Sequence, residues 1–242
     1  MTPTVAPKNA MVLAAGRGER LRPMTDTTAK PLIEVGGKAL IDHGLDKLAA
    51  AGVELAVVNL WYRAATIERH LAGRARPRIA FSREAELMDT GGGVANALPQ
   101  LGNDPFYVIS SDGLWRDGET AALDRLAAAW DDDTMDALLL LQPMEKAGGF
   151  AGAGDFFVES NRRLRRRGAA RSAPYAYTGI QITHPRAFDG CPDGAVSNNL
   201  IWDRALAAGR LYGLVHDGEW CHVGTPQGLA EAERRLAEAG WR

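Results

Sequence analysis

Short apolar runs alternate with amphipathic stretches along the first 142 residues of the chain. The runs are typical of buried strands, and the stretches between them place apolar residues at helical spacing. Gly52 provides a natural stop for the first of these helices. The strands are predicted at 10–16, 54–60, 78–84, 106–112 and 136–142, and the helices at 40–51, 64–71 and 120–130. Strands separated by helices favour a mostly parallel α/β sheet with right-handed crossovers.

The rhythm changes after Pro143. Two strand-like segments, 154–160 and 177–183, bracket an arginine-rich stretch, which predicts an inserted hairpin rather than another crossover. A helix at 199–208, a strand at 210–216 and a last helix at 226–239 follow. No internal repeat or low-complexity linker interrupts the chain, so we expect a single domain over 1–242. Its first part covers about 1–142 and its second part about 143–242.

Composition narrows the class of protein. The 242 residues are 46% hydrophobic, enough for a full core, and the net charge of −2 gives no overall basic field for nucleic acid. Two cysteines, Cys191 and Cys221, make no disulfide framework and suit a reducing cytoplasm. We expect a cytoplasmic protein with no secretory signal, no membrane partner and no nucleic-acid partner. The arginine-rich run "NRRLRRRGAAR" is interpreted as a solvated hairpin tip or an intersubunit patch.

The stretch "MVLAAGRGERLRPMTDTTAKPL", residues 11–32, carries the first candidate chemistry. Gly16 and Gly18 let backbone amides approach a phosphate chain, although a plain tight turn is the alternative. Three arginines and Lys30 add cations that can neutralise phosphate oxygens. The stretch lacks the Gly-Lys-Ser/Thr of a P-loop and the third glycine of the dinucleotide fingerprint.

Taken together, "LAAGRGERLRPMTDTTAKPLIEVGGKALI" closely resembles the signature of the sugar-1-phosphate nucleotidyltransferases, with Ala39 in place of the final proline. The resemblance continues in "MDTGGGVANAL", "FYVISSDGLW", "GDF", "YTGIQI" and "EWCHVGTPQGLAEAE", so it spans almost the whole chain. It implies a Rossmann-like sheet flanked by helices, of the nucleotide-diphosphosugar transferase type, with a small sugar-binding β elaboration. The first part of the chain would bind the nucleotide and the second part the sugar.

The resemblance also implies a reaction. A sugar 1-phosphate attacks the α-phosphorus of a nucleoside triphosphate (NTP) and pyrophosphate leaves, a step that needs positioning and charge neutralisation rather than a general base. The implied catalytic residues are Arg17, Lys30 and Asp112. The implied nucleotide-binding residues are Leu13, Ala14, Ala15, Gly16, Gly18, Glu19, Arg20, Thr90, Gly91, Gly92 and Ser111. The glycines of "TGGG" fit a flat base lying against the start of a helix, and a flexible connector is the alternative.

Asp112 ends an apolar strand, and the resemblance makes it a ligand of Mg²⁺, with Mn²⁺ as the other metal considered. The family has a second metal-binding carboxylate just before "VGT", but in this chain Cys221 and His222 stand there instead. His222 could bind metal, act as a donor to metal-bound water or phosphate, leave the metal to Asp112 alone, or serve structure only. We expect it to face the metal or the phosphates. Sugar contacts are expected from Asp155, Gly179 and Asn199.

The short chain and "DTGGG" are most similar to the branch of the family that transfers uridylyl groups to N-acetylmuramate 1-phosphate in cell-wall recycling. UTP is therefore the favoured NTP partner. Guanylyl transfer to mannose 1-phosphate and thymidylyl transfer to glucose 1-phosphate stay open. So do a catalytically inactive nucleotide-sugar binding protein and a cytidylyltransferase acting on phosphocholine. We expect a monomer or a small homo-oligomer.

Overall fold

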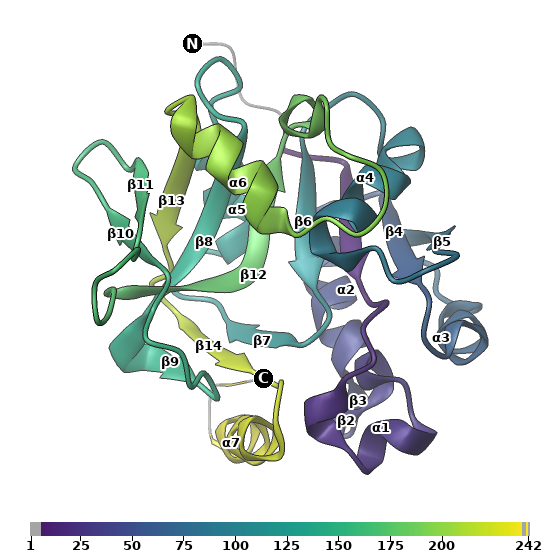
Figure 1. The fold of residues 1–242 in the computed structure, drawn as a ribbon. Helices are drawn as coiled ribbons and strands as arrows, with labels where there is room; N and C mark the ends of the chain where they lie inside the picture. Colours follow the sequence, from purple (N-terminus) through teal and green to yellow (C-terminus); the bar gives the residue numbers. More distant parts are fainter. Residues whose placement is uncertain (1–5, 239–240, 242) are drawn as a thin grey trace.

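A nine-stranded mixed sheet forms the centre of the computed structural model, which describes residues 6–238 and 241 (Figure 1). Its order is β11-β10-β12-β6-β1-β4-β5, with β8 beside β12 and β13 beside β8. The strands of this sheet are β1 (Asn9–Leu13), β4 (Leu55–Leu60), β5 (Arg78–Arg83), β6 (Phe106–Ser110), β8 (Ala137–Pro143), β10 (Phe156–Val158), β11 (Leu164–Arg166), β12 (Tyr175–Thr183) and β13 (Leu211–Val215). The predicted Rossmann-like α/β sheet is confirmed.

Pairing differs between the two parts of the sheet. Strands β6, β1, β4 and β5 pair in parallel, whereas β12 joins β6 and β8 antiparallel. The segment predicted at 136–142 is therefore a strand, but it lies beside β12 instead of continuing the parallel run. Strands β10 and β11 pair antiparallel, so an inserted hairpin is present, but its second strand comes from the arginine-rich segment itself and not from the predicted segment 177–183, which belongs to β12. One sheet thus contains strands from both predicted parts of the chain.

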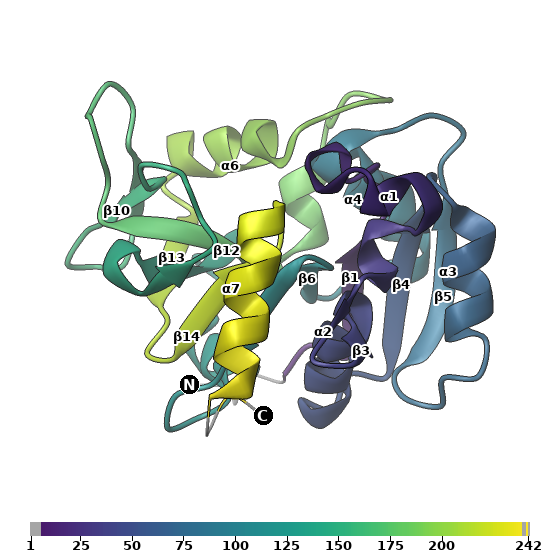
Figure 2. The ribbon, with the colours of Figure 1, turned by 90° about the horizontal axis from the view of Figure 1, so that it is seen from below.

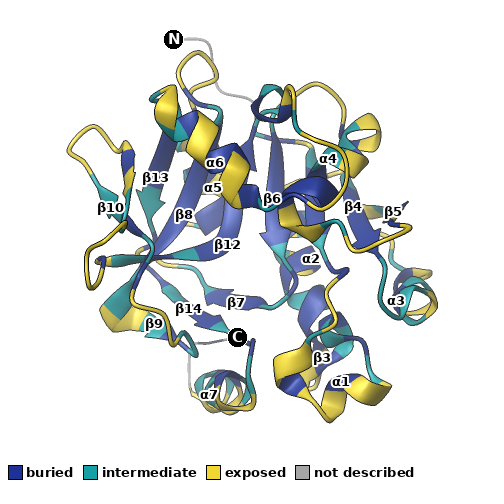
Figure 3. Cartoon of the chain, in the orientation of Figure 1, coloured by how far each residue is buried: buried dark blue, intermediate teal, exposed yellow. Residues whose placement is uncertain are grey.

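Helices bury both faces of the parallel strands. On β1, Ala10 and Val12 belong to one hydrophobic cluster and Met11 to another on the opposite face, which explains why the run is continuously apolar. The helices are α1 (Met24–Thr27), α2 (Leu40–Ala50), α3 (Ala64–Leu71), α4 (Asp89–Leu101), α5 (Ala122–Ala129), α6 (Asn198–Ala207) and α7 (Pro226–Ala237). The first cluster includes side chains of α2, α3 and α5, and the second includes side chains of α4 and α6. Figure 2 shows α4 and α6 on one side of the sheet and α2 on the other. Figure 3 shows the central strands as the most buried part.

A second sheet of three short strands was not predicted from the pattern. It contains β7 (Gly113–Arg116), β14 (Glu219–His222) and β9 (Ala147–Gly148), in the order β7-β14-β9. A further pair, β2 (Glu34–Val35) and β3 (Lys38–Ala39), precedes α2. Short 3-10 turns complete the structure: η1 (Glu19–Leu21), η2 (Lys30–Leu32), η3 (Met144–Lys146) and η4 (Pro185–Phe188). The three-stranded sheet matters for the site because it carries β14 to the end of β6.

One local prediction is wrong. The glycines 91–93 were expected to precede a helix, but they lie inside α4, which begins at Asp89. The helix α1 was not predicted. Helices α2, α3, α5, α6 and α7 agree closely with the predicted ranges; the last one ends at Ala237, and position 239 lies outside the described residues. Within the described part of the chain, no helix combines the length and apolar character that crossing a membrane requires.

Candidate active site

Parallel strands β1 and β6 end at the same edge of the sheet, where α/β proteins place their ligands. A cavity of about 450 Å³ opens there, called the first hollow below. Eight predicted residues line it: Leu13, Ala14, Ala15, Gly16, Lys30, Thr90, Ser111 and Asp112. The sequence reasoning missed six others: Pro31, Asn59, Leu87, Asp89, Ser110 and Ala195. Of these, Asn59 carried a signal, because a polar side chain inside the apolar run "ELAVVNL" calls for a specific partner.

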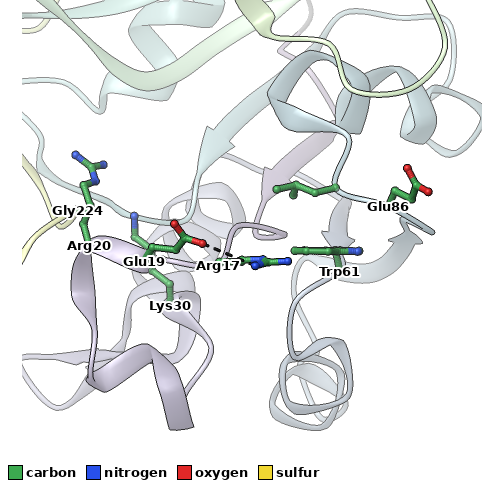
Figure 4. A pocket seen from close by; sticks show the side chains of 9 residues that line it. Arg17, Glu19, Arg20, Lys30, Trp61, Glu86 and Gly224 are labelled. Carbon is green, nitrogen blue, oxygen red and sulfur yellow. Dashed lines mark ion pairs between the residues drawn. The ribbon is translucent and has the colours of Figure 1, made fainter.

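A second hollow of about 720 Å³ adjoins the first, because Lys30 and Leu87 line both. It is lined by the predicted residues Arg17, Gly18, Glu19, Arg20 and Lys30, and by Trp61, Glu86, Leu87 and Gly224. Figure 4 shows the Arg17 guanidinium beside the Trp61 ring, 4.8 Å from its centroid. Arg17 also lies 3.8 Å from the Glu19 carboxyl group, and its side chain is 48% exposed. The Arg17 side chain is thus open to an anionic ligand.

Gly18 is required where the second hollow meets the first. Its φ of +67° lies in the left-handed region, and a Cβ there would come within 2.9 Å of the Lys30 Cβ. A side chain at this position would therefore be strained and would displace the Lys30 stem. The Gly18 carbonyl also accepts a hydrogen bond from the Thr25 hydroxyl at 3.0 Å. The glycine thus lets the loop after β1 pack directly against Lys30.

Lys30, Asp112 and His222 meet at the boundary of the two hollows. The Lys30 ammonium donates to Asp112 Oδ2 at 2.6 Å, and His222 Nε2 lies 3.3 Å from the same oxygen. The Lys30 and Asp112 side chains are only 14% and 22% exposed. Burial by itself raises the pKa of Asp112, but the Lys30 charge and the His222 contact outweigh it and hold that pKa well below its usual range. Asp112 is therefore a carboxylate at neutral pH.

His222 reaches this cluster through the small sheet. Strand β14 pairs antiparallel with β7, which places His222 opposite Gly113 and next to Asp112. The imidazole stacks on the Trp220 ring, with 5.9 Å between centroids and 14° between planes, and the Phe150 ring lies edge-on at 6.5 Å. A Cβ at Gly224 would overlap His222 Cε1, so glycine is needed beside the ring. The ring is thus held in place on two sides.

The predicted residues of α4 divide into two groups. Thr90 faces the first hollow, and its hydroxyl accepts a hydrogen bond from the Asn198 amide at 3.0 Å. Gly91 and Gly92 are buried against the segment 194–198 instead. The Gly92 amide donates to the Val196 carbonyl at 2.9 Å. These two glycines pack helix against chain and do not line either hollow.

The predicted sugar contacts lie outside both hollows. Asp155 accepts a hydrogen bond from the Tyr177 amide at 2.9 Å, which ties β10 to β12. Gly179 on β12 packs against Ser110, where a Cβ would come within 2.9 Å of the serine side chain. Asn199 accepts a hydrogen bond from Arg166 at 2.8 Å in the first turn of α6. The structure therefore brings Gly179 next to the lining of the first hollow through Ser110.

The Asp112 carboxylate offers oxygen atoms of the kind that Mg²⁺ prefers, and the His222 imidazole lies beside it. Among residues 6–238 and 241, no three His, Cys, Asp or Glu side chains group closely enough to hold a metal. Asp112 and His222 form a pair only. Mg²⁺ is commonly held by one or two carboxylates together with substrate phosphates, so a partial protein site of this kind matches phosphate chemistry.

Residues 9–153 match the family described as nucleotidyl transferase. The chain belongs to this family, and it is a sugar-1-phosphate nucleotidyltransferase. It is similar to the N-acetylmuramate alpha-1-phosphate uridylyltransferase of Caulobacter vibrioides, with 46% identity over 97% of this chain and 99% of the relative. The enzyme of the same name from Neisseria meningitidis is 35% identical over 93% of this chain and 96% of the relative.

Solved structures agree on the fold. A putative glucose-1-phosphate thymidylyltransferase from Bacillus anthracis superposes with a TM-score of 0.79 at 20% identity, covering 93% of this chain and 94% of that one. The inositol-1-phosphate CTP transferase of T. maritima gives 0.76 at 18% identity and covers 98% of both chains. These neighbours share the nucleotide-diphosphosugar transferase fold.

Proposed function

We propose that the protein transfers a uridylyl group from UTP to N-acetylmuramate 1-phosphate, giving a UDP-sugar and pyrophosphate. The 46% identical relative with this activity in its name covers nearly the full length of both chains, which supports this choice of sugar and base. A role in cell-wall recycling and a cytoplasmic location follow as predictions of the same proposal. A monomer or small homo-oligomer is expected.

The chemistry matches the charges at the junction of the two hollows. A phosphate oxygen of the sugar 1-phosphate forms a bond to the α-phosphorus of UTP, and the bond to the β-phosphate oxygen breaks. The nucleophile is already an anion, so no proton has to be removed. What the protein must supply is positive charge between two mutually repelling groups. Lys30 stands at that junction, and Arg17 lies further along the second hollow.

We place the nucleoside in the first hollow and the β- and γ-phosphates toward Arg17 in the second. The backbone of Ala14, Ala15 and Gly16 would face the nucleoside, and Lys30 would contact both the α-phosphate and the incoming sugar phosphate. The exposed Arg17 side chain would turn from Trp61 to the leaving pyrophosphate. The sugar would lie toward Gly179, Asp155 and Asn199. The position of Gly179 against Ser110 supports this direction.

Asp112 would hold a divalent ion, Mg²⁺ or Mn²⁺, with His222 as its neighbour and substrate phosphates as further ligands. Such an ion, when bound, neutralises charge on the phosphates. His222 keeps its ring against the Asp112 oxygen by stacking on Trp220. It thereby orients the carboxylate, whether or not the imidazole itself contacts the metal.

The observation that carries the proposal is the partly buried contact between the Lys30 ammonium and Asp112 at the boundary of two adjoining hollows. The test incubates the protein with Mg²⁺, each of UTP, GTP, CTP and dTTP, and a panel of sugar 1-phosphates plus phosphocholine, while pyrophosphate release is followed. We expect the highest kcat/KM for UTP with N-acetylmuramate 1-phosphate. A higher value for any other pair would refute the proposed substrates.

A second candidate is guanylyl transfer to mannose 1-phosphate. A mannose-1-phosphate guanylyltransferase of Mycobacterium tuberculosis is 28% identical over 95% of this chain, although this chain covers only 66% of that relative. The GTP and mannose 1-phosphate arm of the same panel tests it. Pyrophosphate release from no pair at all would favour a nucleotide-sugar binding protein without turnover.

A further inference from the structure

A buried polar pair lies at the first hollow, with Asn59 in its lining and Glu84 behind Asn59. Asn59, near the end of β4, and Glu84, directly after β5, are 3% and 7% exposed. The Asn59 side-chain amide donates to Glu84 Oε1 at 2.7 Å. Neither residue belongs to the cluster of Lys30, Asp112 and His222. Burying polar side chains costs folding free energy unless each donor and acceptor has a hydrogen-bond partner. The partners of Asn59 and Glu84 therefore indicate what the pair does.

Each end of the pair holds a different wall of the first hollow. The Ala14 amide donates to Asn59 Oδ1 at 2.7 Å, and the Met88 amide donates to Glu84 Oε2 at 3.0 Å. The Met88 carbonyl in turn accepts from the Val196 amide at 2.9 Å. The hollow is lined by Ala14 and by the neighbours of Met88 and Val196 in the chain, Leu87 and Ala195. One chain of hydrogen bonds therefore connects three segments that line the hollow: the loop after β1, the start of α4 and the segment 194–198.

The glycines of α4 make room for this chain. A Cβ at Gly93 would lie 2.7 Å from Asn59 Nδ2 and 2.8 Å from Glu84 Oε1. A Cβ at Gly92 would overlap the Gly194 carbonyl oxygen, on the segment that donates to Met88 through Val196. The run "TGGG" thus serves the packing of α4 against the pair and against the segment 194–198.

We propose that Asn59 and Glu84 are positioning residues that fix the width of the first hollow and so set the affinity for the nucleoside triphosphate. Neither residue takes part in bond making or breaking. The pair holds the loop after β1 on one side of the hollow and the start of α4 on the other. This inference rests on the proposed placement of the nucleotide in the first hollow, but not on which base or sugar is used.

The order of donors and acceptors gives a specific test. In Asn59→Asp, two carboxyl groups face each other where one hydrogen bond stood. In Glu84→Gln, one amide group must face another donor, either Asn59 Nδ2 or the Met88 amide. In the double variant, the introduced glutamine amide can donate to the introduced aspartate, which still accepts from the Ala14 amide, while the glutamine oxygen accepts from the Met88 amide. All three hydrogen bonds then return with one of them reversed.

The measurement is steady-state KM for the NTP and for the sugar 1-phosphate, with kcat and the thermal midpoint, on the full-length protein. We expect each single variant to raise KM for the NTP by about tenfold, since one buried hydrogen bond of the chain is lost. The sugar-phosphate KM should stay within about twofold of the wild-type value. The double variant should recover most of the NTP affinity. Ser82→Ala is the matched control, because Ser82 lies on β5 two residues before Glu84 and its hydroxyl accepts a hydrogen bond from the Asn96 side chain of α4. It should leave both KM values unchanged.

A purely structural pair would behave differently. In that case the single variants would lower the thermal midpoint, leave KM for the NTP unchanged and overturn the inference. A double variant as impaired in NTP affinity as either single variant would overturn it as well.

If a single variant does not fold, Gly93→Ala displaces the pair without removing a polar group and should raise the NTP KM in the same way. If UTP is not the substrate, the most active NTP replaces it. If no NTP turns over, the dissociation constant of each NTP measured by calorimetry replaces KM, so failure of the proposed function is separated from failure of the pair.

Discussion

The Lys30 ammonium is the charge on which the proposed chemistry depends most. Lys30→Met keeps most of the aliphatic stem, which passes beside Gly18, and removes only the charge. The lost contact is the 2.6 Å hydrogen bond to Asp112, made by side chains that are 14% and 22% exposed. Solvent therefore screens this charge weakly in the free protein.

Two effects set the expected magnitude. Removing one partner of a buried ion pair costs about 3–5 kcal/mol, and the partial exposure of this pair reduces that to about 2–3 kcal/mol of unfolding free energy. Removing a preorganised charge that stabilises a transition state lowers kcat by about 10²–10³. We therefore expect kcat/KM of Lys30→Met to fall by about a hundredfold or more, a far larger loss than the change in folded population can produce.

The assay is pyrophosphate release with the best substrate pair, at a temperature where circular dichroism shows the variant folded. Lys8→Met is the control, because Lys8 pairs with Glu54 at 3.5 Å on the surface, with side chains 56% and 72% exposed. It should leave kcat/KM unchanged. A Lys30→Met enzyme that keeps kcat/KM within about threefold of wild type would refute the role given to the ammonium.

Three other predictions concern the metal, the packing of α4 and pH. His222→Ala should raise the Mg²⁺ concentration needed for half-maximal rate by about tenfold, because the imidazole orients the metal-binding carboxylate; an unchanged Mg²⁺ titration would count against that role. Gly92→Ala should lower the unfolding free energy in urea by about 1–3 kcal/mol, because its methyl group would overlap the Gly194 carbonyl oxygen, whereas Gly73→Ala, with open space around it, should not. Burial lowers the pKa of His216, so as pH falls below about 6.5 the unfolded chain takes up this proton before the native state does. Stability in urea should therefore decrease from about pH 7.5 to about pH 5.5, and His216→Gln should flatten this slope; a slope equal to that of wild type would contradict the assignment.

Much of the fold could be predicted because it follows from local patterns. The apolar runs of β1, β4 and β6 are continuous since helices cover both faces of those strands, and that pattern is visible in the sequence. The signature residues after β1 also predicted the family, and the family match over residues 9–153 confirms that prediction. The short strands of the small sheet were missed, because two to four residues give no periodicity to detect.

The site shows the same division. The sequence by itself determined which groups are available: cations after β1, a carboxyl group after β6, and a histidine where the family has a carboxylate. Only the tertiary structure decided that His222 lies against Asp112, because this contact depends on β14 pairing with β7 across more than a hundred residues. It also decided that the α4 glycines pack on Asn59, Glu84 and the segment 194–198. Spacing along a chain reports local burial, whereas contacts between distant segments are set by how the strands pair and the helices pack.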